Sequence, residues 1–159
     1  FRSSYLIMAN FITPEDYNAS IHREILSSLL RETSAGGQPN PDYDPQVIEI
    51  CEDRTISEMS SYLDKIYDCD AIFSAVGKER HNLILMFALD ITIYHIFSIH
   101  NPYKIADIRK DRYERAIEWL KGVSRGEITI HGAPRLDSDE QKLNSPWQID
   151  AETLRPTLR

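Results

Sequence analysis

Apolar residues return at helical spacing through most of this chain. Between residues 17 and 30, 48 and 66, and 105 and 123, an apolar side chain follows every three or four positions. Residues 83–99 are instead apolar nearly all round. This pattern predicts amphipathic helices packed around one central buried helix. We therefore expect an all-α fold, a bundle of four main helices followed by a long, mostly extended C-terminal arm.

Start and stop signals place the first two helices. Thr13-Pro14-Glu15-Asp16 offers a side-chain cap, a proline at the first helical position and acids in the first turn, so a helix should run from there to about Arg31. Glycines and prolines between Thr33 and Pro45 predict an exposed loop. A second cap at Asp44 then starts a helix whose apolar stripe ends at Ile66.

The second half of the core is expected to hold a short element and two further helices. Residues 67–77 lose the periodicity but retain enough apolar side chains for a short turn or helix against the core. The third helix is expected to begin near Lys78 and to stop at an Asn-Pro pair. The fourth helix turns Ile108 toward the core, and Gly126 is well placed to end it. Residues 128–130 then predict one short strand.

Length and composition indicate one domain with two flanking segments. The chain of 159 residues matches the rough prior of about 100 to 200 residues per domain. Residues 1–10 are expected to be an N-terminal extension, in which Met8 is a plausible native start and the stretch before it is too short and too polar for a signal peptide. Residues 11–126 then form the helical domain. Residues 127–159, with scattered prolines and isolated apolar residues, form an extended arm.

The charge balance argues against two classes of partner, and the cysteines indicate the redox compartment. With 18 basic and 25 acidic residues the formal net charge is −7, which disfavours bulk attraction to nucleic acid or to an anionic membrane. An acidic subunit can still line a channel through which DNA slides. Cys51 and Cys69 lie far apart and lack metal-ligand spacing, so we expect free thiols in a reducing compartment.

The chemistry-bearing residues give a weak signal for an enzyme or a metal site. Asp90 and His95 are five positions apart, which is not the spacing that places two ligands on one helix face. The apolar run 83–99 is at the short limit for crossing a membrane, and a charge within it is better accommodated in a helical bundle. We expect Asp90 to be a buried structural carboxylate, hydrogen-bonded to Tyr113, Arg112 or a neighbouring backbone group. We predict no catalytic, metal or cofactor site.

Four fragments of the chain occur in an order and at a spacing that go beyond generic amphipathic helices. They are Phe11 to Asp16, Glu58 to Tyr67, Leu89 to Tyr94, and Arg112 to Leu120 followed by Arg125 to Ile128. By these fragments, residues 11–130 resemble the family of small structural proteins of Mu-like prophages, which is related in fold to tailed-phage head–tail connector proteins. Members often have arginine before the tyrosine that closes the second helix and a proline soon after it. This chain differs there, with Ile66 and then Asp-Cys-Asp.

What the resemblance implies is a structural head–tail connector, or adaptor, of a tailed bacteriophage. Such a subunit forms a ring of about twelve copies below the portal protein, joins the capsid to the next tail or stopper component, and continues the DNA channel without sequence-specific binding. It belongs to the virion and is assembled in the host cytoplasm, with no membrane and no enzymatic activity. The alternatives are a tail-completion or stopper protein at the same junction, or a small non-phage helical enzyme or regulator.

Partner-binding residues are expected in the arm and on the fourth helix. Apolar residues in an arm without a core of its own either belong to a disordered terminus or become ordered on a partner, such as the portal protein or a neighbouring copy. They are Ile128, Ile130, Leu136, Leu143, Trp147, Ile149 and Leu154. Mixed charges on the fourth helix form either a solvated face or a contact between subunits, and they are Arg109, Lys110, Asp111, Arg115 and Glu118. Acids interleaved with these bases weaken the field that DNA binding requires.

Overall fold

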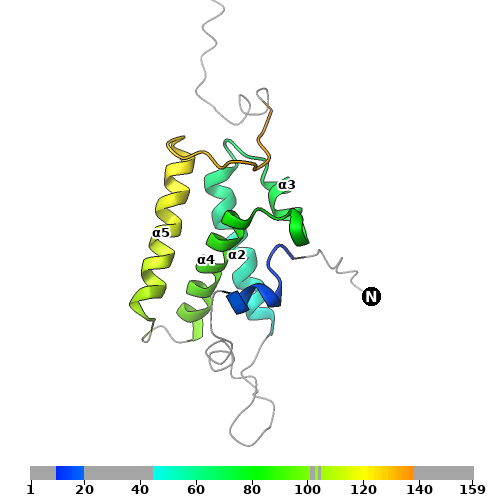
Figure 1. The fold of residues 1–159 in the computed structure, drawn as a ribbon. Coiled ribbons are helices and arrows are strands. Elements are labelled where there is room, and N and C mark those ends of the chain that lie inside the picture. Colours follow the sequence, from blue (N-terminus) through cyan, green and yellow to red (C-terminus); the bar gives the residue numbers. More distant parts are fainter. Residues whose placement is uncertain (1–9, 20–44, 101–102, 104, 138–159) are drawn as a thin grey trace, which may run out of the picture.

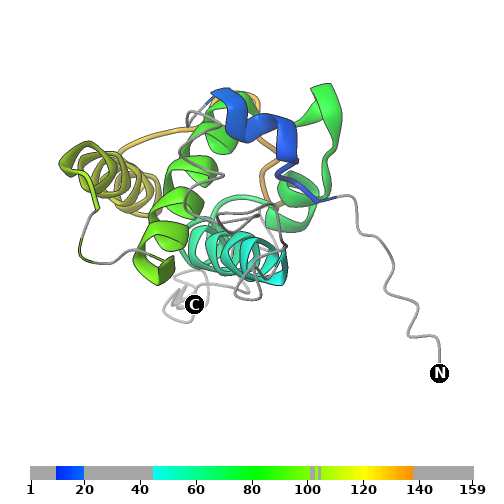
Figure 2. The same cartoon turned by 90° about the horizontal axis from the view of Figure 1, so that it is seen from below.

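Three long helices form the body of the protein in the computed structural model, which describes residues 10–19, 45–100, 103 and 105–137. They lie side by side, each in contact with the other two (Figure 1 and Figure 2), and are α2 (Pro45–Leu63), α4 (Asn82–His100) and α5 (Asp107–Ser124). The shorter elements are the 3-10 helices η1 (Pro14–Ala19) and η2 (Gly77–Glu79) and helix α3 (Cys69–Ser74). The described part of the chain holds no strand and one isolated β-bridge, which confirms the all-α prediction.

Helix α4 is the central helix, as its apolar sequence predicts. It packs between α2 and α5, and its buried hydrophobic residues are Ile84, Phe87, Ala88, Leu89, Ile91, Ile93, Ile96 and Phe97. The window Asn82–Ile99 is long and apolar enough to cross a membrane by length and composition, and 56% of it is buried inside the protein. Two polar side chains in its middle, Asp90 and Thr92, are buried as well and have partners on neighbouring helices. This packing is that of a core helix.

Helix α2 carries the apolar stripe that its sequence predicts. The side chains that repeat along it without exposure to solvent are Cys51, Thr55, Met59 and Leu63. The helix ends at Leu63, earlier than the predicted end at Ile66, because the backbone N–H groups of Ile66 and Tyr67 both turn back to the Leu63 carbonyl. This turn delivers the Tyr67 side chain to the core, where it is buried.

The first and third predicted helices differ from the structure, the first in its type and the third in its start. The first predicted helix begins at Pro14 as expected, but its described part is the 3-10 helix η1. Its continuation and the predicted loop fall within residues 20–44, which lie outside the described residues. Helix α4 starts at Asn82 and not near Lys78, because Gly77 has a φ of +60° and leads a separate 3-10 turn.

The short element predicted between the second and third helices is confirmed as helix α3. Asp68 caps it by accepting a hydrogen bond from the Ala71 N–H at 3.1 Å. Ile72 is buried in the core, and Phe73 packs edge to face on Phe11 with the ring centroids 5.1 Å apart. Helix α3 and the N-terminal segment therefore close the same side of the core.

The segment after α5 does not form the short strand predicted for residues 128–130. It crosses the end of the bundle toward α3 (Figure 1), where Tyr67 and Arg135 form an isolated β-bridge. The Leu136 N–H donates a hydrogen bond to the Ile66 carbonyl at 3.1 Å. A strand needs a partner strand for its backbone groups, and the described part of the chain offers only this turn. The first part of the arm is thus fastened to the bundle as irregular chain.

Candidate interaction surfaces

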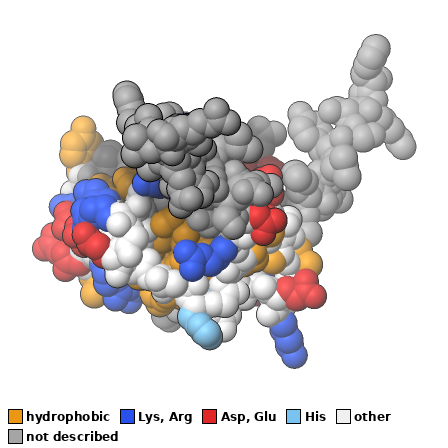
Figure 3. Space-filling model, turned by 90° about the horizontal axis from the view of Figure 1, so that it is seen from above, with side chains coloured by type: hydrophobic (Ala, Val, Ile, Leu, Met, Phe, Trp, Pro, Cys, Tyr) orange, Lys and Arg blue, Asp and Glu red, His pale blue; other side chains and the backbone are white. Residues whose placement is uncertain are grey.

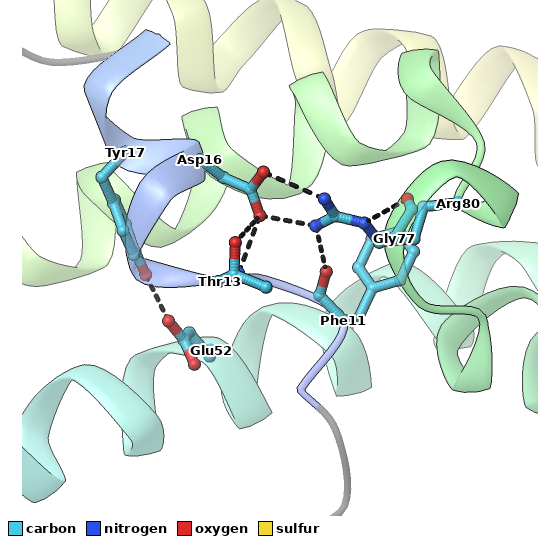
Figure 4. Close-up of polar contacts among 7 residues, drawn as sticks. All are labelled: Phe11, Thr13, Asp16, Tyr17, Glu52, Gly77 and Arg80. Atoms are coloured by element: carbon cyan, nitrogen blue, oxygen red, sulfur yellow. Dashed lines mark hydrogen bonds and ion pairs between the residues drawn. The ribbon is translucent and has the colours of Figure 1, made fainter.

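Arg80 fastens the N-terminal segment to the bundle (Figure 4). Its guanidinium donates hydrogen bonds to both carboxylate oxygens of Asp16 and, at 2.8 Å, to the backbone carbonyl of Phe11. The Asp16 carboxylate also accepts a hydrogen bond from the Thr13 backbone N–H at 2.7 Å. Burial alone would raise the pKa of Asp16, but the bonds from Arg80 and Thr13 outweigh it and hold that pKa below its ordinary value. The ion pair therefore ties the segment to the turn before α4.

Tyr17 attaches the same segment to helix α2. Its hydroxyl donates a hydrogen bond to Glu52 Oε1 at 2.6 Å, and both residues are buried. Burial raises the pKa of Glu52 to about 6, although the hydrogen bond from Tyr17 lowers it. Burial and the neighbouring Glu52 also raise the pKa of Tyr17. With these two attachments, Phe11 is held in place between α2 and α3.

A groove of about 560 Å³ opens beside this segment, between α2 and α3. Phe11, Ile56 and Phe73 give it apolar walls, and Asp53 and Asp70 add exposed carboxylates. We refer to it as the α2–α3 groove. Its volume lies within the range of about 300 to 1,000 Å³ that is typical of ligand pockets. It can therefore receive a large apolar group that carries a hydrogen-bond donor.

Three apolar side chains are exposed where the chain passes from α4 to α5. Tyr103 is 98% exposed, Ile108 58% and Ile99 46%. We refer to them as the α4–α5 corner; the end of α4 and the start of α5 lie at the lower left of Figure 1, diagonally across from α3. The prediction that Ile108 faces the core is wrong, because the face of α5 that packs on the other helices runs through Arg109, Tyr113 and Ala116, and Ile108 lies to one side of it.

A polar network joins the three long helices. Glu58 on α2 accepts a hydrogen bond from the Tyr113 hydroxyl on α5 and pairs with His95 Nε2 on α4, each at 3.0 Å. Tyr94 stacks on Tyr113 with the ring centroids 4.1 Å apart. Burial and the bond to Glu58 raise the pKa of Tyr113 to about 12. Because these side chains find their partners on other helices, the network fixes how the helices sit against one another.

Asp90 is buried, as predicted, with 5% of the residue exposed. Its carboxylate forms ion pairs with Arg112, one of the predicted partners, at 4.0 Å and with Arg115 at 3.3 Å, whereas Tyr113, another predicted partner, bonds to Glu58. Burial raises the pKa of Asp90, and the charges of the two arginines offset only part of that effect. Asp90 therefore links α4 to α5 as a structural carboxylate.

The charges predicted for contacts between subunits are not equally available. Those exposed on α5 are Lys110, Asp111 and Glu118. Arg115 is exposed too but pairs with Asp90, and Arg109 is half-buried. Figure 3 shows both signs of charge side by side along the edge that α5 forms. Mixed charges are thus present on this face, but part of the set serves the packing of α5 on α4.

The apolar residues of the arm that were predicted to bind a partner differ in how far they are buried. Ile130 is 3% exposed and its backbone N–H donates to the Tyr67 hydroxyl at 2.7 Å, which corrects the prediction that it contacts a partner, because its side chain already belongs to the core. Ile128 is 37% exposed and lies over Gly122, where an added Cβ would come within 2.6 Å of its Cδ1. Leu136 is half-buried. The other predicted anchors lie outside the described residues: Leu143, Trp147, Ile149 and Leu154.

The residues considered for metal or thiol chemistry stay apart. The His81 ring bonds through Nε2 to the backbone carbonyl of His131 at 2.8 Å. Cys51 and Cys69 are free and buried, and burial raises the pKa of the Cys69 thiol to about 12. Within residues 10–19, 45–100, 103 and 105–137, no group of three or more His, Cys, Asp or Glu side chains could hold a metal ion.

No family model, curated protein or solved structure matches this chain. Its function is therefore inferred from the surfaces above and from the sequence resemblance. Neither the α2–α3 groove nor the α4–α5 corner was found from the sequence. The groove combines residues from three segments far apart in the chain, which no local pattern marks. The sequence did hold one indication that Tyr103 is exposed: it is a large aromatic residue directly after the Asn-Pro pair, where there is no helix face on which it could pack.

Proposed function

We propose that this protein is a head–tail connector (adaptor) subunit of a tailed bacteriophage or prophage, assembled with neighbouring copies into a ring of about twelve below the portal protein. One observation carries the proposal: the bundle exposes two unlike apolar surfaces, the α2–α3 groove and the α4–α5 corner, on opposite sides of one core. The sequence resemblance over residues 11–130 supports it independently.

Two unlike surfaces on one chain favour head-to-tail contacts. A two-fold dimer uses the same patch on both subunits, whereas contacts between different patches leave one patch of each kind free for the next copy. Such contacts close into a ring when the rotation between neighbours fits, and otherwise continue as a filament. A portal protein with a fixed number of subunits would select the closed ring.

The core has the stiffness that a ring subunit needs. The Glu58 network ties all three long helices together, and the Arg80–Asp16 pair fastens the N-terminal segment that forms one wall of the groove. Both sets of contacts are partly buried, where hydrogen bonds and ion pairs are less weakened by water. The helices that carry the two apolar surfaces are therefore tied to one another by these contacts.

The arm gives the subunit its reach. The described arm is bonded to the core as far as Leu136, and the sequence places four large apolar residues beyond it, namely Leu143, Trp147, Ile149 and Leu154. Large aromatic and apolar side chains dominate binding hot spots. We infer that these residues contact the portal protein or a neighbouring subunit.

The charge distribution suits the passage of DNA better than its capture. The net charge is −7, acids alternate with bases along α5, and Arg115 and Arg112 face Asp90. Duplex DNA would pass through the channel without sequence-specific binding. In this role the protein assembles in the host cytoplasm and acts in the virion, where it joins the portal to the next tail or stopper component without a membrane or an enzymatic step.

Light scattering coupled to size-exclusion chromatography tests the proposal on the full chain, with and without the portal protein of a Mu-like prophage. We expect a small species for the chain alone and a ring-sized complex with portal. Deletion of residues 138–159 should abolish the complex and leave the fold intact, because the deletion spares the segment bonded to Ile66 and Asp68. Glu140→Gln in the full-length arm is the matched control and should assemble normally.

Three outcomes would contradict the adaptor role. A monomer or dimer indifferent to portal would remove it. Binding to a preformed portal–adaptor complex, but not to portal alone, would assign the chain to the stopper or tail-completion position at the same junction. Retention of duplex DNA in a gel shift, with a steep loss as salt is raised, would favour a regulator.

A further inference from the structure

We propose that Tyr103 of one copy inserts into the α2–α3 groove of the neighbouring copy. The contact between subunits would then be an aromatic side chain held between apolar walls. This inference rests on the proposed self-assembly and identifies the residues that make it.

Tyr103 has the properties of an anchor without its pocket. It is 98% exposed, and Ile108 and Ile99 beside it in the chain are also exposed. Tyrosine and tryptophan are enriched among interface hot spots, where a flanking ring of less important contacts excludes water. At the α4–α5 corner, Tyr103 would be the anchor and the two isoleucines its flanking contacts.

The α2–α3 groove has the chemistry that a tyrosine requires. The half-buried Phe73 already meets the buried Phe11 edge to face, so a third ring against Phe73 would extend an arrangement that aromatic side chains favour. The carboxylates of Asp53 and Asp70 can accept a hydrogen bond from the phenol hydroxyl. The groove lining contains the acids Asp53 and Asp70 but no Lys or Arg, so the phenol hydroxyl would meet hydrogen-bond acceptors there.

The positions of the two surfaces point to a second copy as the occupant. The groove lies beside α3 and the N-terminal segment, whereas Tyr103 follows the far end of α4, with the body of the bundle between them (Figure 1 and Figure 2). A chain cannot place its own Tyr103 in its own groove without unfolding the bundle. Insertion into a neighbour leaves that neighbour's Tyr103 free for the next copy, which is the head-to-tail geometry that a ring requires.

Disulfide trapping on the full chain tests the contact directly. The double variant Tyr103→Cys with Phe73→Cys should give a ladder of linked dimers and larger species under mild oxidation at high protein concentration. The control pairs Tyr103→Cys with Lys78→Cys, an exposed position near α3 outside the groove lining. Both variants also carry Cys69→Ala, because Cys69 lines the groove and its free thiol could react with an inserted Tyr103→Cys. Cys51 is buried and outside the groove lining, and it is present in both variants.

A ladder from the groove pair alone supports the proposal. No ladder from a folded groove pair, or an equal ladder from the control, overturns it. Linkage of Phe73→Cys to Trp147→Cys in place of Tyr103→Cys would also overturn it, because the groove would then belong to the arm.

Single substitutions give a second readout that does not depend on new thiols. Tyr103→Ala should weaken self-association, measured by sedimentation equilibrium, by about tenfold or more, as expected for a hot-spot aromatic residue. Tyr103→Phe should associate more weakly than the wild type and more strongly than Tyr103→Ala, since it retains the ring and loses the hydroxyl. Both variants should fold, because the side chain is exposed. Met86→Ala, at an exposed apolar position on α4, is the matched control and should associate like the wild type.

The same variants separate this inference from the adaptor role. If Tyr103→Ala forms the complex with portal as well as the wild type does, the proposed contact is wrong while the adaptor role stands. If Tyr103→Ala reduces self-association but the wild type never binds portal, the contact stands and the adaptor role is wrong.

Discussion

Replacing Glu52 by glutamine should stabilise the protein at neutral pH, because Glu52 is ionised there against the preference of its surroundings. The residue is 8% exposed, and burial raises its pKa from 4.5 to about 6. At pH 7 the folded protein therefore holds a carboxylate where a neutral group is favoured. Glutamine preserves the length of the side chain and an oxygen that can accept the hydrogen bond from Tyr17.

The size and sign of the effect follow from the two pKa values. One pKa unit corresponds to about 1.4 kcal/mol, so a shift from 4.5 to about 6 corresponds to about 2 kcal/mol. Between these values the folded state binds more protons than the unfolded state. The stability that this carboxyl contributes is therefore fully present below pH 4.5, is lost as the pH rises through about 6, and stays constant above. Glutamine has no proton to lose and avoids this loss.

Urea denaturation followed by circular dichroism, at about pH 4 and about pH 7.5, measures the difference. We expect the free energy of unfolding of Glu52→Gln, relative to the wild type, to rise by about 2 kcal/mol between the two conditions. Glu114→Gln makes the same charge change at an exposed position on α5 and should show no such rise. A difference independent of pH would refute the reasoning, because it would show that the bond from Tyr17 stabilises the carboxylate as much as burial opposes it.

Three further substitutions test the contacts that hold the described structure together. Arg80→Ala should lower the free energy of unfolding, measured by urea denaturation, by about 2 kcal/mol or more, because several hydrogen bonds of a charged group are lost. It should also speed proteolytic cleavage before Asp16, and cleavage at the wild-type rate would contradict the role of Arg80 in fastening this segment. Tyr67→Phe should lower the free energy of unfolding by about 1 kcal/mol and expose the Ile130 N–H to hydrogen exchange. An unchanged exchange rate of this N–H would argue that Tyr67 does not attach the arm. Asp90→Ala should lower the melting temperature by removing about 1 kcal/mol from the free energy of unfolding, since Arg112 and Arg115 lose their partner. An unchanged melting temperature would refute a structural role for Asp90.

The helices were predictable from sequence where burial repeats locally. The stripe on α2 and the all-round apolar sequence of α4 reflect a side chain's position on its own helix, which periodicity reports. The exceptions arise from longer-range geometry. Ile108 was assigned to the inner face by continuing the period of α5, but the face that packs runs through Arg109, Tyr113 and Ala116 and leaves Ile108 to one side. Spacing alone does not fix which apolar residues at the border of a helix face the neighbouring helices cover.

The candidate surfaces were less predictable than the helices, for the same reason. The burial of Asp90 was predictable because one carboxylate stood in an apolar run, and the predicted partner Arg112 does pair with it, but its closer partner depended on competition among residues of α5. Tyr113 is taken by Glu58, and Arg115 is left for Asp90. The α2–α3 groove depends on the N-terminal segment lying against α3, a contact fixed by Arg80 and not by any repeating pattern.

The energetics of the proposed contact explain why assembly would depend on a portal. A tyrosine that becomes buried removes about 150 to 250 Å² from water, which corresponds to about 4 to 6 kcal/mol at 25 cal/mol per Å². Association itself costs an estimated 4 to 15 kcal/mol, so one Tyr103–groove contact leaves a pair of copies weakly bound at best. In a closed ring each copy uses both its corner and its groove, and contacts of the arm with portal add to them. A contact that joins free copies only weakly, and only at high protein concentration, can thus contribute to a ring on a template, and at low concentration assembly would wait for the portal.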